Sequence, residues 1–200
     1  MMPEVRAAAD RFMMDCANLR YLIAGVPADA LEREITPLGW TLRQTIGHVV
    51  ATQERYADTV ARFNTHESEG GAFDLAAINA AVAEATRATP LPELMMRLDK
   101  SLITLFAGLA QLPEDDTDAS LAWLVKAVTQ WSSHISDHAI DFVDAVPEVR
   151  MDPMVLNWVL YTDYHGDDRR TAAQVALLNE VRESLDAEDD DESEDDEEGH

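Results

Sequence analysis

Residues 41–63 read T-L-R-Q-T-I-G-H-V-V-A-T-Q-E-R-Y-A-D-T-V-A-R-F. Apolar residues recur in this stretch with the period of an amphipathic α-helix and not with that of a β-strand. Thr41 and Gln44 have the spacing of a capping box, so we expect the helix to begin directly after Thr41. Its predicted inward face comprises Leu42, Ile46, Val49, Tyr56, Val60 and Phe63.

The same helical period extends over most of the remaining chain, and no segment shows a sustained alternation of β-branched and polar residues. We therefore predict an all-α fold. Several long helices with short connections favour an antiparallel four-helix bundle, followed by extra C-terminal helices. The predicted long helices cover residues 3–24, 41–65, 90–112 and 120–145, and the shorter ones cover residues 74–85, 153–160 and 171–185.

Residues 186–200 differ from the rest of the chain because they contain eleven acidic residues and no Lys or Arg. A block of like charges cannot bury enough apolar surface to offset the entropy that it loses on ordering. We therefore assign residues 1–185 to one helical bundle domain and predict that residues 186–200 form a disordered acidic tail. Such a tail either keeps the protein in solution or docks a basic partner.

The chain has a formal net charge of −24. This charge repels phosphate backbones and anionic lipids, which argues against direct nucleic-acid binding and against a membrane partner. We find neither the roughly 20 apolar residues of a membrane span nor the apolar block of a signal peptide, and we predict a cytoplasmic protein. Cys16 is the single cysteine, which agrees with a reducing compartment, and we expect its thiol to be buried and unreactive.

Three of the six histidines occupy positions where they can meet. His134 and His138 are four residues apart in one predicted helix, so their side chains lie on one face, a turn apart. Both lie near the margin of the apolar stripe, and His48 has a similar place in its own helix. If the two helices are neighbours, the three imidazoles can converge on one metal ion and leave coordination positions open.

Each of these histidines also has a simpler interpretation. A histidine pair at this spacing arises by chance in many helices, and a single histidine beside an apolar stripe is usually a surface or core residue. His66, His165 and His200 lie in polar stretches or at the chain end, and we interpret them as solvated. Four tryptophans are interpreted as packing residues: Trp40, Trp123, Trp131 and Trp158.

Three stretches of the chain favour the ligand interpretation. The second helix of the DinB/YfiT-like superfamily resembles residues 39–56, which read G-W-T-L-R-Q-T-I-G-H-V-V-A-T-Q-E-R-Y. The H-x-x-x-H pair of its fourth helix resembles residues 131–142, W-S-S-H-I-S-D-H-A-I-D-F. The crossover of members related to mycothiol-dependent maleylpyruvate isomerase is similar to residues 73–82, F-D-L-A-A-I-N-A-A-V. Together the resemblance covers about residues 5–146.

The resemblance implies that His48, His134 and His138 bind a divalent metal, commonly zinc or nickel, in a four-helix bundle with one crossed connection. It also implies a relation to enzymes that use low-molecular-weight thiols such as mycothiol, bacillithiol or glutathione. Three neutral imidazoles leave a metal its full charge, which can hold a thiol as thiolate or lower the pKa of a bound water. Asp137 and Asp141 lie within a turn of these ligands and can orient an imidazole N–H group.

Two classes of function remain open. The first is a metal-dependent transferase or isomerase that uses a low-molecular-weight thiol on a small-molecule substrate, with metal-dependent hydrolysis as a variant. The second is a noncatalytic metal-binding or ligand-binding bundle. We find no Gly-rich phosphate loop and no G-x-S-x-G elbow, which disfavours phosphoryl transfer and serine hydrolysis. A homodimer is an open alternative to a monomer.

Overall fold

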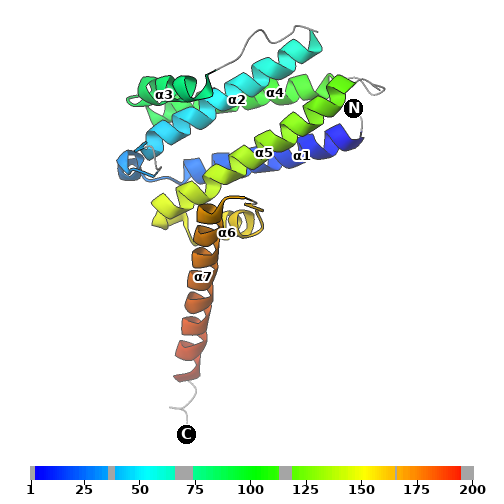
Figure 1. Cartoon of the computed structure of the whole chain (residues 1–200). Helices are drawn as coiled ribbons and strands as arrows, with labels where there is room; N and C mark the ends of the chain where they lie inside the picture. Colours follow the sequence, from blue (N-terminus) through cyan, green and yellow to red (C-terminus); the bar gives the residue numbers. More distant parts are fainter. Residues whose placement is uncertain (1–2, 36–38, 66–73, 113–118, 165, 195–200) are drawn as a thin grey trace.

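Seven α-helices make up most of the structure, a computed structural model that describes residues 3–35, 39–65, 74–112, 119–164 and 166–194 (Figure 1). These residues contain one isolated β-bridge, between Glu34 and Thr41, and no β-strand. The all-α prediction is therefore confirmed. Within the same residues, no helix combines the length and the apolar character that crossing a membrane requires.

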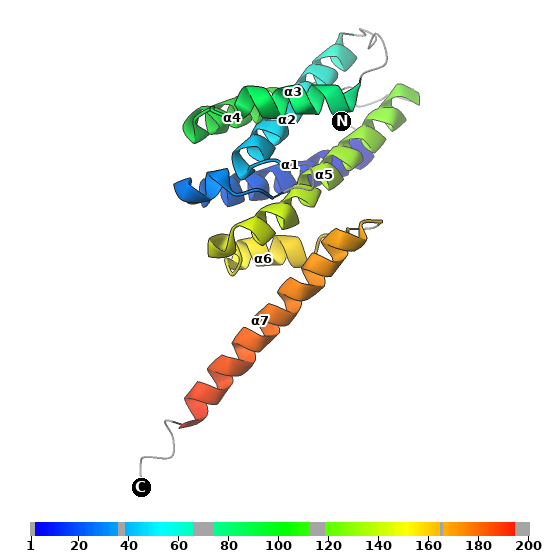
Figure 2. The same ribbon diagram turned by 60° about the vertical axis from the view of Figure 1, so that its left-hand side comes forward.

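Four long helices form a bundle: α1 (Pro3–Ala24), α2 (Leu42–Asn64), α4 (Leu91–Ala110) and α5 (Ala119–Ala145). Helix α1 packs mainly against α5, and α2 packs mainly against α4 (Figures 1 and 2). The two helices of each pair run in the same direction, and the two pairs run in opposite directions (Figure 1). The predicted antiparallel four-helix bundle is confirmed. Helices within one pair are parallel, and the two pairs are antiparallel to each other.

Hydrogen bonds at both ends of α2 show that it runs parallel to α4. At its start, Arg43 donates to the carbonyl of Thr89, and at its end Asn64 donates to the carbonyl of Gly108. Parallel neighbours need a long connection, which includes the helix α3 (Leu75–Thr86) that packs against α2. This connection is the crossover that the family resemblance implied.

Side-chain caps are present at two helix starts, and the first of them is the predicted capping box. The backbone N–H of Thr41 donates to Gln44 Oε1 at 2.9 Å, and the N–H of Gln44 donates to Thr41 Oγ1 at 3.3 Å. Asp74 accepts from the N–H of Ala77 and caps α3. The capping box fixes the start of α2, the helix that carries His48.

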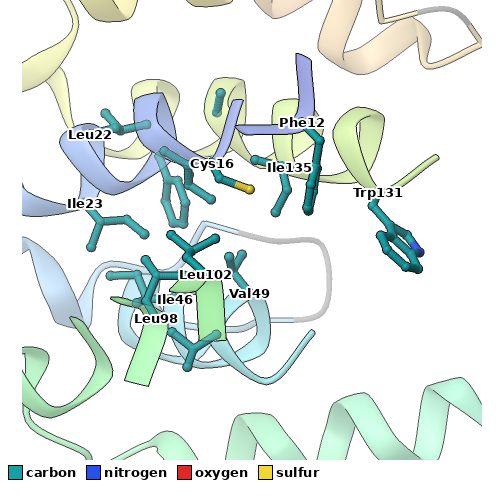
Figure 3. Close-up of a cluster of buried hydrophobic side chains, with 14 of the residues drawn as sticks. Phe12, Cys16, Leu22, Ile23, Ile46, Val49, Leu98, Leu102, Trp131 and Ile135 are labelled. Carbon is teal, nitrogen blue, oxygen red and sulfur yellow. The ribbon is translucent and has the colours of Figure 1, made fainter. Parts of the chain in front are cut away.

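The core lies between the two helix pairs (Figure 3). Phe12, Ile46, Leu98 and Ile135 come from the four bundle helices and have almost no exposed surface. Cys16 is buried among them, and burial raises the pKa of its thiol. The prediction of a buried cysteine is therefore confirmed.

Further helical segments complete the fold: η1 (Ala28–Glu32) before the bundle's second helix, and η2 (Pro147–Val149), α6 (Pro153–Leu160) and the long α7 (Asp168–Glu194) after α5. The start of α7 is anchored by Gln174, whose amide donates to backbone carbonyls at the end of α6. Leu177 is fully buried in the same region. Beyond it, α7 extends away from the bundle (Figures 1 and 2).

Helix α7 continues past the predicted end at residue 185. Residues 186–194 are helical, which differs from the disorder expected of them, and residues 195–200 lie outside the described residues. The physical reason is that adding a residue to an existing helix costs much less than nucleating one. The anchored start of α7 supplies that nucleus, and the helix continues into the acidic segment.

Candidate metal centre

Three histidines from two bundle helices meet at one point. His48 lies on α2, and His134 and His138 lie on α5, one turn apart. The Nε2 atom of His134 is 3.2 Å from that of His48 and 3.3 Å from that of His138. One nitrogen atom from each ring lies within 4.8 Å of the others. The structure thus brings together the three residues that the sequence suggested as metal ligands.

Burial favours the neutral form of two of these imidazoles, His48 and His134. His48 and His138 are buried, and His134 is partly buried. Burial lowers the pKa of His48 to about 3, with smaller contributions from the nearby charges of His138 and Arg55. Burial is also the largest cause of the pKa of His134 lying well below its ordinary value. A neutral imidazole has a free lone pair, which is the form that binds a metal.

The outward ring nitrogens have different surroundings. His138 Nδ1 lies 3.5 Å from Asp141 Oδ2, and His134 Nδ1 lies 3.4 Å from the hydroxyl of Tyr56. His48 Nδ1 and His138 Nδ1 are both buried without a hydrogen-bond partner among the described residues, so the contact of His138 with Asp141 is one of ion-pair distance only. With Nδ1 protonated, His134 can donate to the Tyr56 hydroxyl and present an unprotonated Nε2 atom to the cluster, while His138 Nδ1 faces the carboxylate of Asp141.

Asp141 connects the histidine cluster to α7. Its carboxylate is buried and accepts from Arg170 at 3.0 Å and also from Arg169. Burial alone would raise the pKa of Asp141, but the contacts with His138 and the two arginines outweigh it and hold the pKa well below its ordinary value. The sequence analysis did not assign these arginines to the site. The available signal was an Arg-Arg pair in a strongly acidic chain.

The second predicted aspartate has a different role. Asp137 pairs with Arg170 at 3.2 Å and contacts no imidazole ring nitrogen of the described residues. The prediction that an aspartate supports the histidine pair therefore fits Asp141 and not Asp137. His66, His165 and His200 lie outside the described residues.

Aromatic rings border the cluster. The ring centroids of Trp40 and His48 are 5.5 Å apart, and Tyr56 stacks on Trp131 with ring centroids 4.3 Å apart. Trp131 and Trp158 are buried, as expected of packing residues. Trp123 is 49% exposed, which contradicts that expectation, because it lies on the outward face of α5.

The donor set fits a divalent transition metal. At these separations, Nε2 atoms in the unprotonated form would direct their lone pairs toward one another, an arrangement that a cation or a shared proton must stabilise. Imidazole ligands suit zinc and nickel, and three of them leave at least one coordination position for another ligand. His48, His134 and His138 could therefore hold such an ion with an open position.

Fold and cluster together define a class of proteins: helical bundles that can hold a metal ion between two of their long helices. The family model of the DinB superfamily matches residues 15–175, and the chain belongs to that superfamily. No curated protein and no solved structure gives a significant match. The matched range extends beyond the residues on which the sequence resemblance rested, and it includes α6 and the two arginines of α7 that pair with Asp141.

Proposed function

We propose that His48, His134 and His138 bind one divalent metal ion, zinc or nickel, and that the protein transfers a low-molecular-weight thiol to a small electrophilic substrate. The convergence of the three ring nitrogens within 4.8 Å carries this proposal. When bound, the ion would supply the positive charge that favours a thiolate over a thiol at neutral pH. Membership of the DinB superfamily supports the same assignment.

The chain's own groups suit this chemistry. The neutral imidazoles add no negative charge to the site, so they would leave the charge of the ion available to an anionic sulfur. Asp141 and Tyr56 support two of the rings from their Nδ1 sides. Cys16 cannot replace an external thiol, because it is 2% exposed and burial raises its pKa. The reacting sulfur therefore comes from a small molecule.

We also propose a cytoplasmic location. A thiol-dependent reaction needs its thiol in the reduced form, which the cytosol maintains. The single free cysteine of the chain is compatible with that compartment. Fractionation of cells that express the tagged protein tests this assignment.

Metal binding is tested first, without reference to activity. A ligand that binds only the native state stabilises it by RT ln(1 + [L]/Kd), about 2.7 kcal/mol at a hundredfold excess over Kd. We expect close to one ion per chain and a higher thermal midpoint after loading with zinc or nickel. His48→Ala and His138→Ala should each remove that increase. Substoichiometric metal and an unchanged midpoint in the wild type would contradict the proposal.

The transferase activity is tested with metal-loaded protein and a chromogenic electrophile. Mycothiol, bacillithiol, glutathione and coenzyme A are assayed in parallel, with His134→Ala as the inactive control. We expect a chelator to abolish the reaction and Cys16→Ser to retain it. If no thiol exceeds the control while the wild type keeps its metal, metal-dependent hydrolysis or a noncatalytic binding role replaces the transferase assignment.

A further inference from the structure

Arg55 is a guanidinium beside the histidine cluster. It lies on α2 two turns after His48, so both side chains belong to the same face of the helix. Its neighbour Tyr56 reaches His134 with its hydroxyl. Arg55 is half-buried and donates to Thr52 Oγ1 at 2.8 Å. Among the described residues, no carboxylate lies within ion-pair distance of it.

The absence of a carboxylate partner is unusual in this molecule. The chain has 39 acidic residues against 15 basic ones. Of the other arginines, all except Arg182 lie within 4.0 Å of a carboxylate oxygen of a described residue. Arg182 is exposed on the outer part of α7, where water can solvate it. Arg55 is half-buried, so it gains more from an anionic partner.

The surroundings of the cluster are positively charged although the protein as a whole is acidic. Arg55 places a positive charge on the face of α2 that carries His48, and Arg170 places one beside the α5 segment that carries His138. Asp141, the carboxylate that approaches the cluster, is already paired with two arginines of α7. A bound divalent ion would add further positive charge. An anionic ligand at this place would balance it.

We propose that Arg55 binds the carboxylate of the small thiol that the site takes. The proposal rests on the proposed function and narrows its substrate class to thiols that carry a carboxylate. A guanidinium binds a carboxylate through two parallel N–H···O hydrogen bonds, which fix orientation as well as position. Holding the carboxylate at Arg55 would direct the sulfur at the other end of the molecule toward the three imidazoles.

The test uses two thiols that differ in one group. N-acetylcysteine carries a carboxylate, and N-acetylcysteine amide carries a neutral amide in its place. Both are titrated calorimetrically into zinc-loaded protein. We expect the wild type to bind the carboxylate form at least about tenfold more tightly. Arg55→Gln should remove this preference and keep the zinc content and the affinity for the amide, and Arg55→Lys should restore part of it.

Arg182→Gln is the matched control, because it removes another arginine that has no carboxylate partner in the described part of the chain, and it should behave as the wild type does. Direct chelation of zinc by the carboxylate would give a preference that survives in Arg55→Gln. That result, or equal binding of both thiols by the wild type, would overturn the role of Arg55 and leave the proposed function intact. If neither thiol binds the zinc-loaded wild type, the proposed function fails as well. Circular dichroism verifies that each variant is folded.

Discussion

At the scale of single residues, Asp141 decides how firmly His138 is held. Its carboxylate lies between the Nδ1 atom of His138 and two arginines of α7. Removing the outer partner of a ligating imidazole typically weakens metal binding by about 10- to 100-fold. We predict a loss of this size in Asp141→Asn, measured by competition with a chromophoric chelator.

Asp137 provides the control for that prediction. It pairs with Arg170, as Asp141 does, and contacts no imidazole nitrogen in the described part of the chain. Asp137→Asn should therefore change zinc affinity only slightly. Equal losses in the two variants would mean that the ion pairs with α7 matter and that the contact with His138 does not.

Gly47 is the residue that allows α3 to approach α2 next to His48. A Cβ atom at this position would lie 2.1 Å from Thr86 Oγ1 and 2.4 Å from its Cβ. Alanine would favour the helix by about 1 kcal/mol, but overpacking of this kind costs about 1–3 kcal/mol, so the clash dominates. We predict that Gly47→Ala lowers the thermal midpoint.

Gly25→Ala is the comparison for Gly47. The nearest atom to a Cβ added there is a methyl group of Val149 at 3.3 Å, which a small shift can accommodate. Its thermal midpoint should change less than that of Gly47→Ala. The reverse order would show that the contact between α2 and α3 yields more easily than its short distances suggest.

At the scale of elements, α7 has an anchored part and an extended part. The anchored part includes Gln174 and the two arginines that pair with Asp141, whereas residues 182–187 are exposed. Truncation after Ala187 should leave thermal midpoint and zinc affinity unchanged, because it removes no described contact of the bundle. A large loss of stability at moderate salt would show that the acidic segment packs on the body.

Truncation after Gly166 makes the complementary test. It removes the whole of α7 and leaves the buried Asp141 without its arginines. An unpaired buried carboxylate is costly, so both stability and zinc affinity should fall. Retention of both would show that α7 is unnecessary for the site.

At the scale of the whole molecule, the stability of the metal-free protein should depend on pH through its buried histidines. Burial, with smaller contributions from His138 and Arg55, lowers the pKa of His48 to about 3 from an ordinary value of 6.5. Between these values the unfolded chain binds a proton that the folded chain does not. The free energy of unfolding therefore falls as pH drops below 6.5.

We expect the thermal midpoint of the metal-free wild type to fall more steeply than that of His48→Gln between pH 7 and about 5. The many acidic residues titrate in both proteins, so their contribution cancels in the comparison. Scanning calorimetry in the presence of a chelator measures the two slopes. Identical slopes would mean that His48 takes up a proton in the folded protein without cost.

The sequence by itself determined the features that depend on residues within a turn or two of each other. The capping box of Thr41 and Gln44 and the helical period of the bundle helices are local, because a helix forms its hydrogen bonds within its own segment. The pairing of His134 with His138 is local for the same reason. That His48 joins them came from the resemblance of ordered motifs to the DinB/YfiT-like superfamily.

Only the tertiary structure decided which distant groups surround those histidines. Asp141 and Arg170 are 29 residues apart, and Gln174 finds its carbonyl partners at the end of another helix. Arg55 stands out only once the partners of the other arginines are known. Such contacts depend on the angle and register at which whole helices pack, and side chains far apart in the chain set both.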